Sequence, residues 1–294
     1  MDFSKLPTDF FLTSLQYTKN VHSDQYPAVD PTREDLSLAG KVVIVTGASR
    51  GLGAKAFAPA FAKAGARGLV LVATNAEALK NVEREVKKIN AEIETLAISA
   101  DISDGQAVTS AFERIKATFG HADILINNAG INRDGEGVVL SQADPETWWR
   151  QFEVNGKGTF LVTHAFINQL PARDTPATII NLTTGAAWKG NPMAPGYSVS
   201  KLVTQQLVPA IAPVHPNIMA VALLGLLRAE FGFEMLDLHL LQGVVAVVWL
   251  RLWLCLGACA MGRWSWRWRW RWRYAGARRR SCIFLVLWML GHET

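Results

Sequence analysis

Short runs of apolar residues alternate with amphipathic stretches between positions 41 and 223. After its lysine, the first run (41–45) consists of Val and Ile, which is typical of a strand buried on both faces. Further runs predict strands at 68–73, 96–100, 124–126, 178–182 and 218–223. The stretches between them predict five helices. One follows Gly53, one spans 75–89, one comes after the third strand and ends at Phe119, and two span 148–170 and 197–212. This strict alternation predicts an α/β fold with one parallel sheet, right-handed crossovers and helices on both faces, in three layers.

A glycine-rich turn directly follows the first predicted strand. It has the sequence Thr46-Gly-Ala-Ser-Arg-Gly-Leu-Gly53 and leads into an Ala-rich helix. Between a strand and a helix, such a turn lets the backbone approach a pyrophosphate, whose charge meets the helix N-terminus. Pro59 lies inside this helix, so either the helix bends there or the position is unfavourable.

Other polar candidates also lie where predicted strands end. Asp101 follows the third strand, Asn127-Asn-Ala-Gly130 follows the fourth, and the pair Thr183-Thr184 follows the fifth. In open parallel sheets, ligands bind beyond the carboxyl ends of the strands. We therefore expect these segments and the glycine turn to form one site.

Tyr197 and Lys201 are four residues apart, so on a helix they share one face. A phenol normally titrates near pH ~10, and a neighbouring ammonium lowers its pKa towards the range useful for acid–base chemistry. A Tyr and a Lys at this spacing also occur by chance on solvated helices, so the surrounding motifs decide the interpretation.

Taken in chain order, these motifs resemble the short-chain dehydrogenase/reductase family, classical type, over residues 40 to about 222. Asn155 and the thirteen-residue separation of Thr184 from Tyr197 belong to the same pattern. The resemblance implies a Rossmann-like doubly wound sheet, a nicotinamide cofactor, and an enzyme that interconverts a small-molecule carbonyl and an alcohol by hydride transfer. It also implies a homo-oligomer formed through the long helices.

The resemblance also implies a role for each of four catalytic candidates. Tyr197 would donate or accept the proton on the substrate oxygen, and Lys201 would lower its pKa and bind the nicotinamide ribose. Asn155 would hold a water that relays protons to Lys201. Thr184 would orient and polarise the carbonyl, where the family usually has Ser. The alternative for Thr184 is a strand-end hydroxyl satisfied by the backbone.

The cofactor-binding residues that the resemblance implies are Gly47, Ser49, Arg50, Gly51, Leu52, Gly53, Thr74, Asp101, Ile102, Asn128, Ala129, Gly130, Tyr197 and Lys201. Because 72–75 contains no acid for a ribose 2′-hydroxyl and Arg50 can meet a 2′-phosphate, NADP(H) is favoured over NAD(H). Asp101 would contact the adenine; alternatively, it caps the following helix.

Charge and cysteine content separate the C-terminal part from the rest. The segment 263–280 has eight Arg and no acid, so it contributes a charge of +8. The net charge of the whole chain is +5, so the remainder carries 5 − 8 = −3. The high pI is therefore no reason to expect a nucleic-acid partner. The three Cys lie at 255, 259 and 282, so a Cys-free body fits a reducing, cytoplasmic location. Cys255 and Cys259 have no His or carboxylate close by, and we expect no metal site.

We expect three regions: an irregular N-terminal arm (1–38) containing Pro27 and Pro31, a cofactor-binding and catalytic domain (39–223), and an atypical tail (224–294). The apolar run 10–12 is too short for a signal peptide. At 223–227 the chain has Leu-Leu-Gly-Leu-Leu where the family has a Pro-Gly turn. The sheet is therefore expected to be incomplete after its sixth strand.

Three interpretations of the tail remain. Residues 240–261 are long enough for a membrane anchor but contain Arg251. The Arg-Trp repeat at 267–272 is typical of a basic surface that binds lipid or nucleic acid. We favour the third, an aberrant translation, because eight of the eleven Trp and every Cys lie there and the β/α alternation stops. The alternative functions are accordingly a cofactor-binding but catalytically impaired protein and a membrane-associated dehydrogenase.

Overall fold

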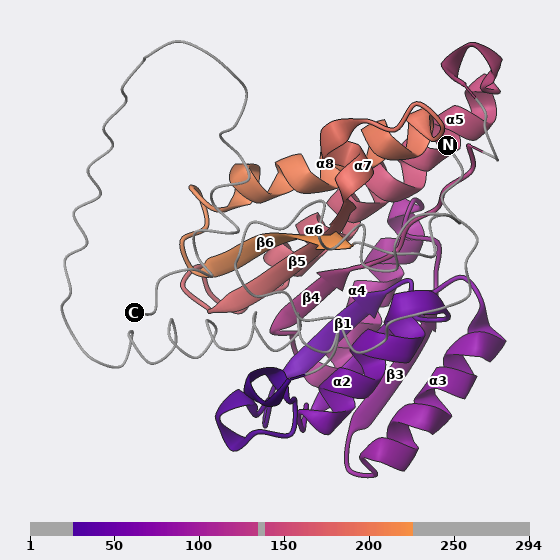
Figure 1. Ribbon diagram of the computed structural model, residues 1–294. Coiled ribbons are helices and arrows are strands. Elements are labelled where there is room, and N and C mark those ends of the chain that lie inside the picture. The colour runs from indigo at the N-terminus through magenta and orange to yellow at the C-terminus, as the bar shows by residue number, and fades with distance from the viewer. Residues whose placement is uncertain (1–25, 135–138, 226–294) are drawn as a thin grey trace.

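A computed structural model describes residues 26–134 and 139–225 of the chain. Its centre is a parallel sheet of six strands in the order β3-β2-β1-β4-β5-β6, with helices on both faces (Figure 1). The strands are β1 (Val42–Thr46), β2 (Gly68–Ala73), β3 (Glu94–Ser99), β4 (Ile124–Asn127), β5 (Ala177–Thr184) and β6 (Ile218–Gly225). The predicted α/β fold with a doubly wound sheet is confirmed.

Strand β1 shows how the sequence produces the layers. All five of its residues are buried, and they pair in parallel with β2 on one side and β4 on the other. Val43 and Val45 belong to one hydrophobic core, whereas Val42 and Ile44 belong to the other. Because successive side chains of a strand point to opposite faces, a continuous apolar run supplies both cores at once.

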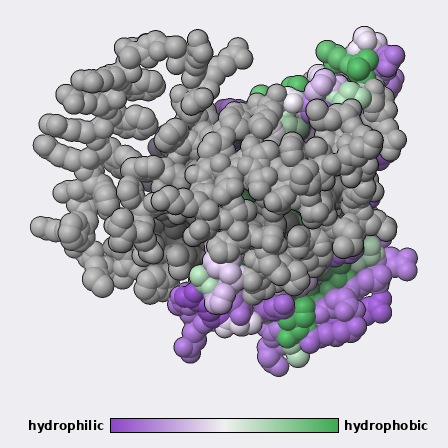
Figure 2. All heavy atoms as spheres, in the orientation of Figure 1, coloured by the Kyte–Doolittle hydropathy of each residue, from purple (hydrophilic) through white to green (hydrophobic). Residues whose placement is uncertain are grey.

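The helices divide between these two cores. Helices α2 (Ala58–Lys63) and α3 (Ala76–Ile89) pack on the first core. Helices α4 (Gly105–Phe119), α6 (Thr159–Asn168) and α8 (Pro195–Ile211) pack on the second. Around α3, at the lower right of Figure 1, the surface is mainly hydrophilic (Figure 2). The remaining short elements are α5 (Pro145–Gln151), α7 (Gly185–Lys189) and the 3₁₀ turn η5 (Leu140–Gln142).

Two helices contain a π-helical turn that the periodicity did not predict. The segment predicted as one helix at 148–170 consists of α5, the π turn η6 (Phe152–Gly158) and α6. The helix after the glycine turn begins with the π turn η4 (Gly53–Phe57), in which the Ala58 N–H bonds the Gly53 carbonyl. Pro59 is the second residue of α2, two positions after this wider turn, so the residue that lacks an N–H lies in the first turn of α2.

The described part of the N-terminal arm is irregular and packs on the first core. Residues 26–38 form two 3₁₀ turns, η2 (Pro27–Val29) and η3 (Glu34–Leu36). Val29, Leu36 and Leu38 are buried, and the Leu38 N–H donates to the Ala64 carbonyl at 2.8 Å.

Among the described residues, no helix is both long enough and apolar enough to cross a membrane. The anchor candidate at 240–261, the Arg-Trp repeat and any seventh strand lie outside the described residues.

Candidate active site

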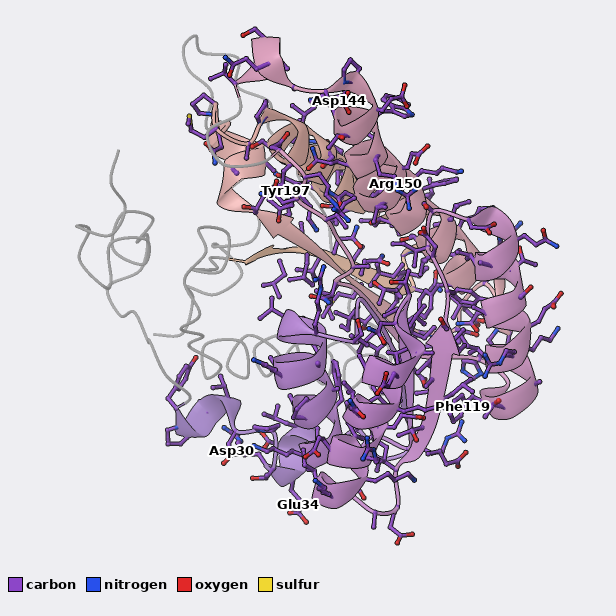
Figure 3. The ribbon with its side chains drawn as sticks, turned by 90° about the vertical axis from the view of Figure 1, so that its right-hand side faces the viewer. Asp30, Glu34, Phe119, Asp144, Arg150 and Tyr197 are labelled. Atoms are coloured by element: carbon purple, nitrogen blue, oxygen red, sulfur yellow. The ribbon has the colours of Figure 1, made fainter. Side chains whose placement is uncertain are left out.

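A cleft of about 850 Å³ lies beyond the carboxyl ends of the strands. Figure 3 shows Tyr197 and Arg150 at this end of the molecule, away from Asp30, Glu34 and Phe119. The cleft brings together predicted residues from five separate segments: Gly47, Ser49, Arg50, Gly51, Leu52, Thr74, Asp101, Ile102, Asn128, Ala129, Gly130, Tyr197 and Lys201. Gly53, Asn155 and Thr184 were also predicted at the site but do not line the cleft.

The glycine turn is locked against the turn after β4. Gly47 has a φ of +65°, and a Cβ there would lie 2.8 Å from Ala129 Cα. A Cβ on Gly53 would lie 2.8 Å from Ala48 Cα and closer still to the Gly47 carbonyl. The Asn128 side chain donates to the carbonyls of Thr46 (2.9 Å) and Gly47 (3.2 Å). Only glycine therefore lets the turn fold this tightly and leave its backbone facing the cleft.

Cationic side chains outnumber carboxylates around the cleft. The charged residues in its lining are Arg50, Arg133, Arg150, Lys201, Asp101 and Glu146. Thr74 is exposed at the end of β2, and Asn75 caps α3 by accepting the Ala78 N–H at 2.9 Å. A glycine cradle, a cationic excess and no acid at 72–75 together fit the phosphates of a dinucleotide.

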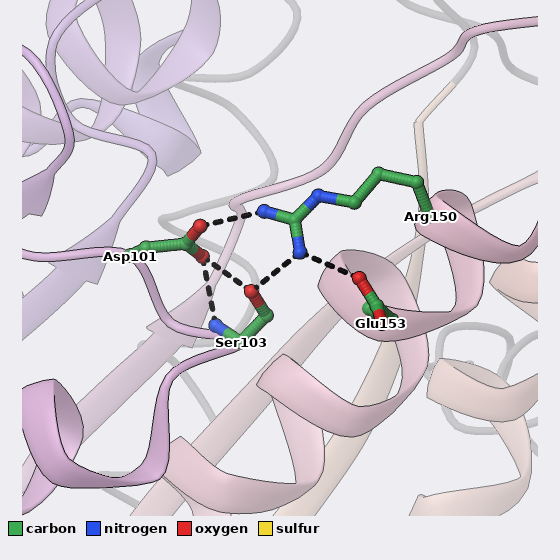
Figure 4. Close-up of polar contacts among 4 residues, drawn as sticks. All are labelled: Asp101, Ser103, Arg150 and Glu153. Atoms are coloured by element: carbon green, nitrogen blue, oxygen red, sulfur yellow. Dashed lines mark hydrogen bonds and ion pairs between the residues drawn. The ribbon is translucent and has the colours of Figure 1, made fainter. Parts of the chain in front are cut away.

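Asp101 lines the cleft and is held in a polar network with Ser103, Arg150 and Glu153 (Figure 4). Its Oδ1 accepts from the Ser103 N–H (2.9 Å) and hydroxyl (2.7 Å), and its Oδ2 pairs with Arg150 at 2.6 Å. Arg150 also donates to Ser103 Oγ at 2.8 Å and pairs with Glu153 at 2.7 Å. Partial burial raises the pKa of Asp101, but the bonds from Ser103 and Arg150 outweigh it and hold the pKa below its usual value.

Asp101 does not cap the following helix. Asp104 caps α4 instead, because its carboxylate accepts the N–H groups of Gln106 and Ala107. The capping alternative for Asp101 was therefore wrong, and its carboxylate belongs to the cleft. Ile102 is buried beside it, against Gly158 of the second π turn.

Lys201 is 4% exposed and held from both sides by strand β5 and its own helix. Its Nζ donates to the Leu182 carbonyl at 3.0 Å. Its own carbonyl accepts from the hydroxyls of Thr204 (2.7 Å) and Thr183 (3.3 Å). Tyr197 is half-buried on the same helix and also lines the cleft. The fold therefore places Tyr197 and Lys201 in the lining of the same cleft as the glycine turn.

Asn155 lies in the second π turn and joins two walls of the site. Its Oδ1 accepts the Ile131 N–H at 2.8 Å, and its Nδ2 donates to the Ile131 carbonyl and to Ser200 Oγ, both at 2.9 Å. The Ser200 hydroxyl in turn donates to the Tyr197 carbonyl at 2.9 Å. The side chain of Asn155 thus connects the segment after β4 to the helix of Tyr197.

Thr184 is buried at the end of β5. Its hydroxyl accepts the Ala186 N–H at 3.2 Å and so caps the short helix α7. This is the backbone contact that the alternative interpretation expected. Its neighbour Thr183 lines the cleft.

Several residues of the lining were not predicted from the sequence. Asn132 and Arg133 follow β4, and Glu146, Thr147 and Arg150 lie on α5. The position of 131–133 directly after the Asn-Asn-Ala-Gly turn could have indicated the first two. The described residues contain no cluster of three or more side chains suited to hold a metal ion.

A family model described as short chain dehydrogenase matches residues 41–218. The short chain dehydrogenase pigC of Monascus ruber is 36% identical over 205 residues, which cover 67% of this chain and 62% of that protein. The chain spans less than two thirds of the length of the first curated relatives that it matches.

Solved structures show the same fold. A metagenomic short-chain oxidoreductase in complex with NADP has a TM-score of 0.62 and 28% identity, with 72% of this chain and 91% of that chain covered. A xylitol dehydrogenase bound to NAD⁺ has a TM-score of 0.57 and 26% identity, with 64% and 71% covered.

Proposed function

The chain belongs to the short-chain dehydrogenase family, and from that premise we propose that it is an NADP(H)-dependent oxidoreductase that interconverts a carbonyl and an alcohol. The observation that carries the proposal is a single cleft shared by the glycine turn, the turn after β4, Tyr197 and Lys201. These segments are far apart in sequence, and each supplies a different part of the same chemistry.

The proposed cofactor is NADP(H) rather than NAD(H). The glycine turn would hold the pyrophosphate, while Asp101 and Ile102 would hold the adenine. Arg50 is exposed at the mouth of the turn, and Thr74 offers a hydroxyl rather than a carboxylate. A carboxylate there would repel a 2′-phosphate, whereas a guanidinium binds it with charge-assisted hydrogen bonds. One solved structure of similar fold contains NADP and another contains NAD⁺, so these two do not decide between the cofactors. The proposed preference for NADP(H) therefore rests on the side chains of Arg50 and Thr74.

When bound, the nicotinamide supplies or accepts the hydride. Tyr197 holds a proton at its phenol oxygen and exchanges it with the substrate oxygen. The charge of the Lys201 ammonium would stabilise the phenolate form of Tyr197. The burial of Lys201 strengthens this interaction, because buried charges are screened less by water than exposed ones.

Thr184 and Asn155 would support this proton transfer. A hydroxyl that accepts the Ala186 N–H still has its own proton to donate, and Thr184, which is buried next to the cleft residue Thr183, would direct that proton to the substrate oxygen. Asn155 would hold a water near Lys201. Its amide also fixes the helix of Tyr197 through Ser200, so its loss would disturb the phenol as well.

The proposed catalytic unit is 39–223, because every proposed site residue lies within it. We place the protein in the cytoplasm, because this unit lacks Cys. The proposed partners are a small-molecule substrate and further copies of the chain.

The test is NADPH oxidation with a panel of carbonyl compounds, using the wild-type chain and Tyr197→Phe. We expect turnover by the wild type and at least about a 10²-fold loss in the variant, the usual range for a removed general acid. Turnover that survives the substitution would contradict the assignment. NADPH binding without turnover of any carbonyl would instead favour the impaired-protein alternative, which the Leu-Leu-Gly-Leu-Leu segment motivates.

A further inference from the structure

Helix α8, which carries Tyr197 and Lys201, begins without a capping side chain of its own. Its N-cap residue is Ala194, which makes no side-chain cap hydrogen bond, and Pro195 follows at the first position. A methyl group cannot accept the N–H groups of the first turn, and proline has no N–H to satisfy. The N–H groups of Gly196 and Tyr197 therefore need acceptors from elsewhere in the chain.

The carboxylate of Asp134, in the segment after β4, accepts both of them. Its Oδ1 accepts the Gly196 N–H at 3.1 Å, and its Oδ2 accepts the Tyr197 N–H at 2.7 Å. Asp134 is 6% exposed, so these bonds replace its contacts with water. A carboxylate at a helix N-terminus is further stabilised by the helix dipole.

Gln151 fixes the orientation of this carboxylate. Its Nε2 donates to Asp134 Oδ1 at 3.0 Å, and its Oε1 accepts the Arg133 N–H at 3.0 Å. Gln151 has no exposed surface. A Cβ on Gly196 would lie 2.8 Å from Asp134 Oδ1, so the carboxylate packs directly against the backbone before Tyr197.

The backbone of Tyr197 is thus held at both ends. Asp134 binds its N–H, and Ser200 binds its carbonyl. Asp134 does not line the cleft, so it is placed to act on Tyr197 rather than on a bound molecule.

We propose that Asp134 is a positioning residue: it fixes the first turn of α8 so that the Tyr197 phenol stays aligned with the substrate oxygen for proton transfer. The inference rests on the proposed proton-transfer role of Tyr197. Asp134 exchanges no proton itself; it sets where the phenol lies. A misplacement of about 1 Å can cost about 10²-fold in rate, which sets the expected size of the effect.

The variants are Asp134→Ala and Asp134→Asn, with Asp104→Ala as the matched control. Asp104 also caps a helix by accepting two N–H groups, but the helix is α4 and its side chain does not line the cleft. The first readout is the ring signal of Tyr197 in ¹³C-tyrosine NMR spectra. The chain has only four Tyr, and Tyr197→Phe assigns the signal. The second readout is kcat and the KM for NADPH.

We expect Asp134→Ala to shift or split the Tyr197 signal and to lower kcat by about 10²-fold with the KM for NADPH unchanged. For Asp134→Asn, the Tyr197 signal and kcat should lie between those of Asp134→Ala and the wild type, because the Asn side chain keeps one acceptor oxygen. Asp104→Ala should lower stability without either change. If Asp134→Ala fails to fold, Asp134→Asn carries the same comparison.

An unchanged Tyr197 signal and kcat in folded Asp134 variants would overturn the proposal. Equal changes in Asp104→Ala would overturn it too, because the effect would then be a general loss of stability. If the wild type reduces no carbonyl, the proposed activity fails, but the Tyr197 signal still decides the role of Asp134.

Discussion

Replacing Arg150 by Met tests the polar network at one end of the cleft. The substitution removes the ion pairs to Asp101 (2.6 Å) and Glu153 (2.7 Å) but keeps an unbranched apolar side chain. The three side chains are 38–42% exposed, so water screens both pairs. Pairs of this kind contribute about 0.2–1 kcal/mol each, so we expect a loss of about 1 kcal/mol in the free energy of unfolding.

The pH dependence of this loss has a definite sign. The pKa of Asp101 is lower in the folded chain than its usual value, so its ionised form stabilises the fold above the unfolded pKa, about 3.9. This contribution is lost as the pH falls through the lower, folded pKa. Arg150 causes part of the lowering of the Asp101 pKa. The difference in unfolding free energy between wild type and Arg150→Met should therefore have its full value near neutral pH and shrink towards zero in acid.

Urea unfolding over a pH series measures this difference, with Arg114→Met as the control. Arg114 is exposed and donates to the Ala97 carbonyl at 3.3 Å, so its replacement should have little effect at any pH. A loss above about 3 kcal/mol would mean that the pair behaves as a buried one. A loss independent of pH would refute the assignment of the effect to the ionised Asp101.

Three further substitutions test separate parts of the site. Gly53→Ala should cost about 1–3 kcal/mol in unfolding free energy and abolish NADPH binding, because its Cβ would overlap the glycine turn. Urea unfolding and cofactor titration measure the two effects, and Gly105→Ala is the control because a Cβ there would meet open space. Arg50→Gln should weaken NADPH binding by about 10–100-fold and leave NADH binding unchanged, as fluorescence titration can show; equal losses for both cofactors would argue against a 2′-phosphate contact. Thr184→Val should lower kcat by about 10²–10³-fold in steady-state assays and Thr184→Ser should retain it, whereas full activity in Thr184→Val would leave its hydroxyl with only a capping role.

Local patterns predicted the sheet well, because buried parallel strands are continuous apolar runs. The second strand was predicted at 68–73 and lies at Gly68–Ala73. The glycine turn and the Asn-Asn-Ala-Gly turn meet in one cleft because parallel strands bring their carboxyl ends to the same edge.

Periodicity could not reveal the π turns. Over five to seven residues, a wider helical turn changes the side-chain pattern too little to be distinguished from a regular helix. The helix predicted at 148–170 therefore hides the turn that contains Asn155.

The ion pair of Arg150 with Asp101 and the bond from the Tyr197 N–H to Asp134 could not be predicted, because they join residues 49 and 63 positions apart along the chain. Only an indirect signal existed for Asp134. Ala194 precedes Pro195 at the start of a helix where a capping side chain would be expected, which indicates a cap from elsewhere.

We propose that a nicotinamide bound in this cleft transfers the hydride while Tyr197 supplies the proton. The most direct test uses NADPH deuterated at the transferred position of the nicotinamide, one carbonyl substrate and mass analysis of the alcohol. With NADPH at concentrations that saturate both proteins, we predict deuterium on the carbinol carbon with the wild type and almost no labelled alcohol with Tyr197→Phe. Equal labelling by both proteins would contradict the claim.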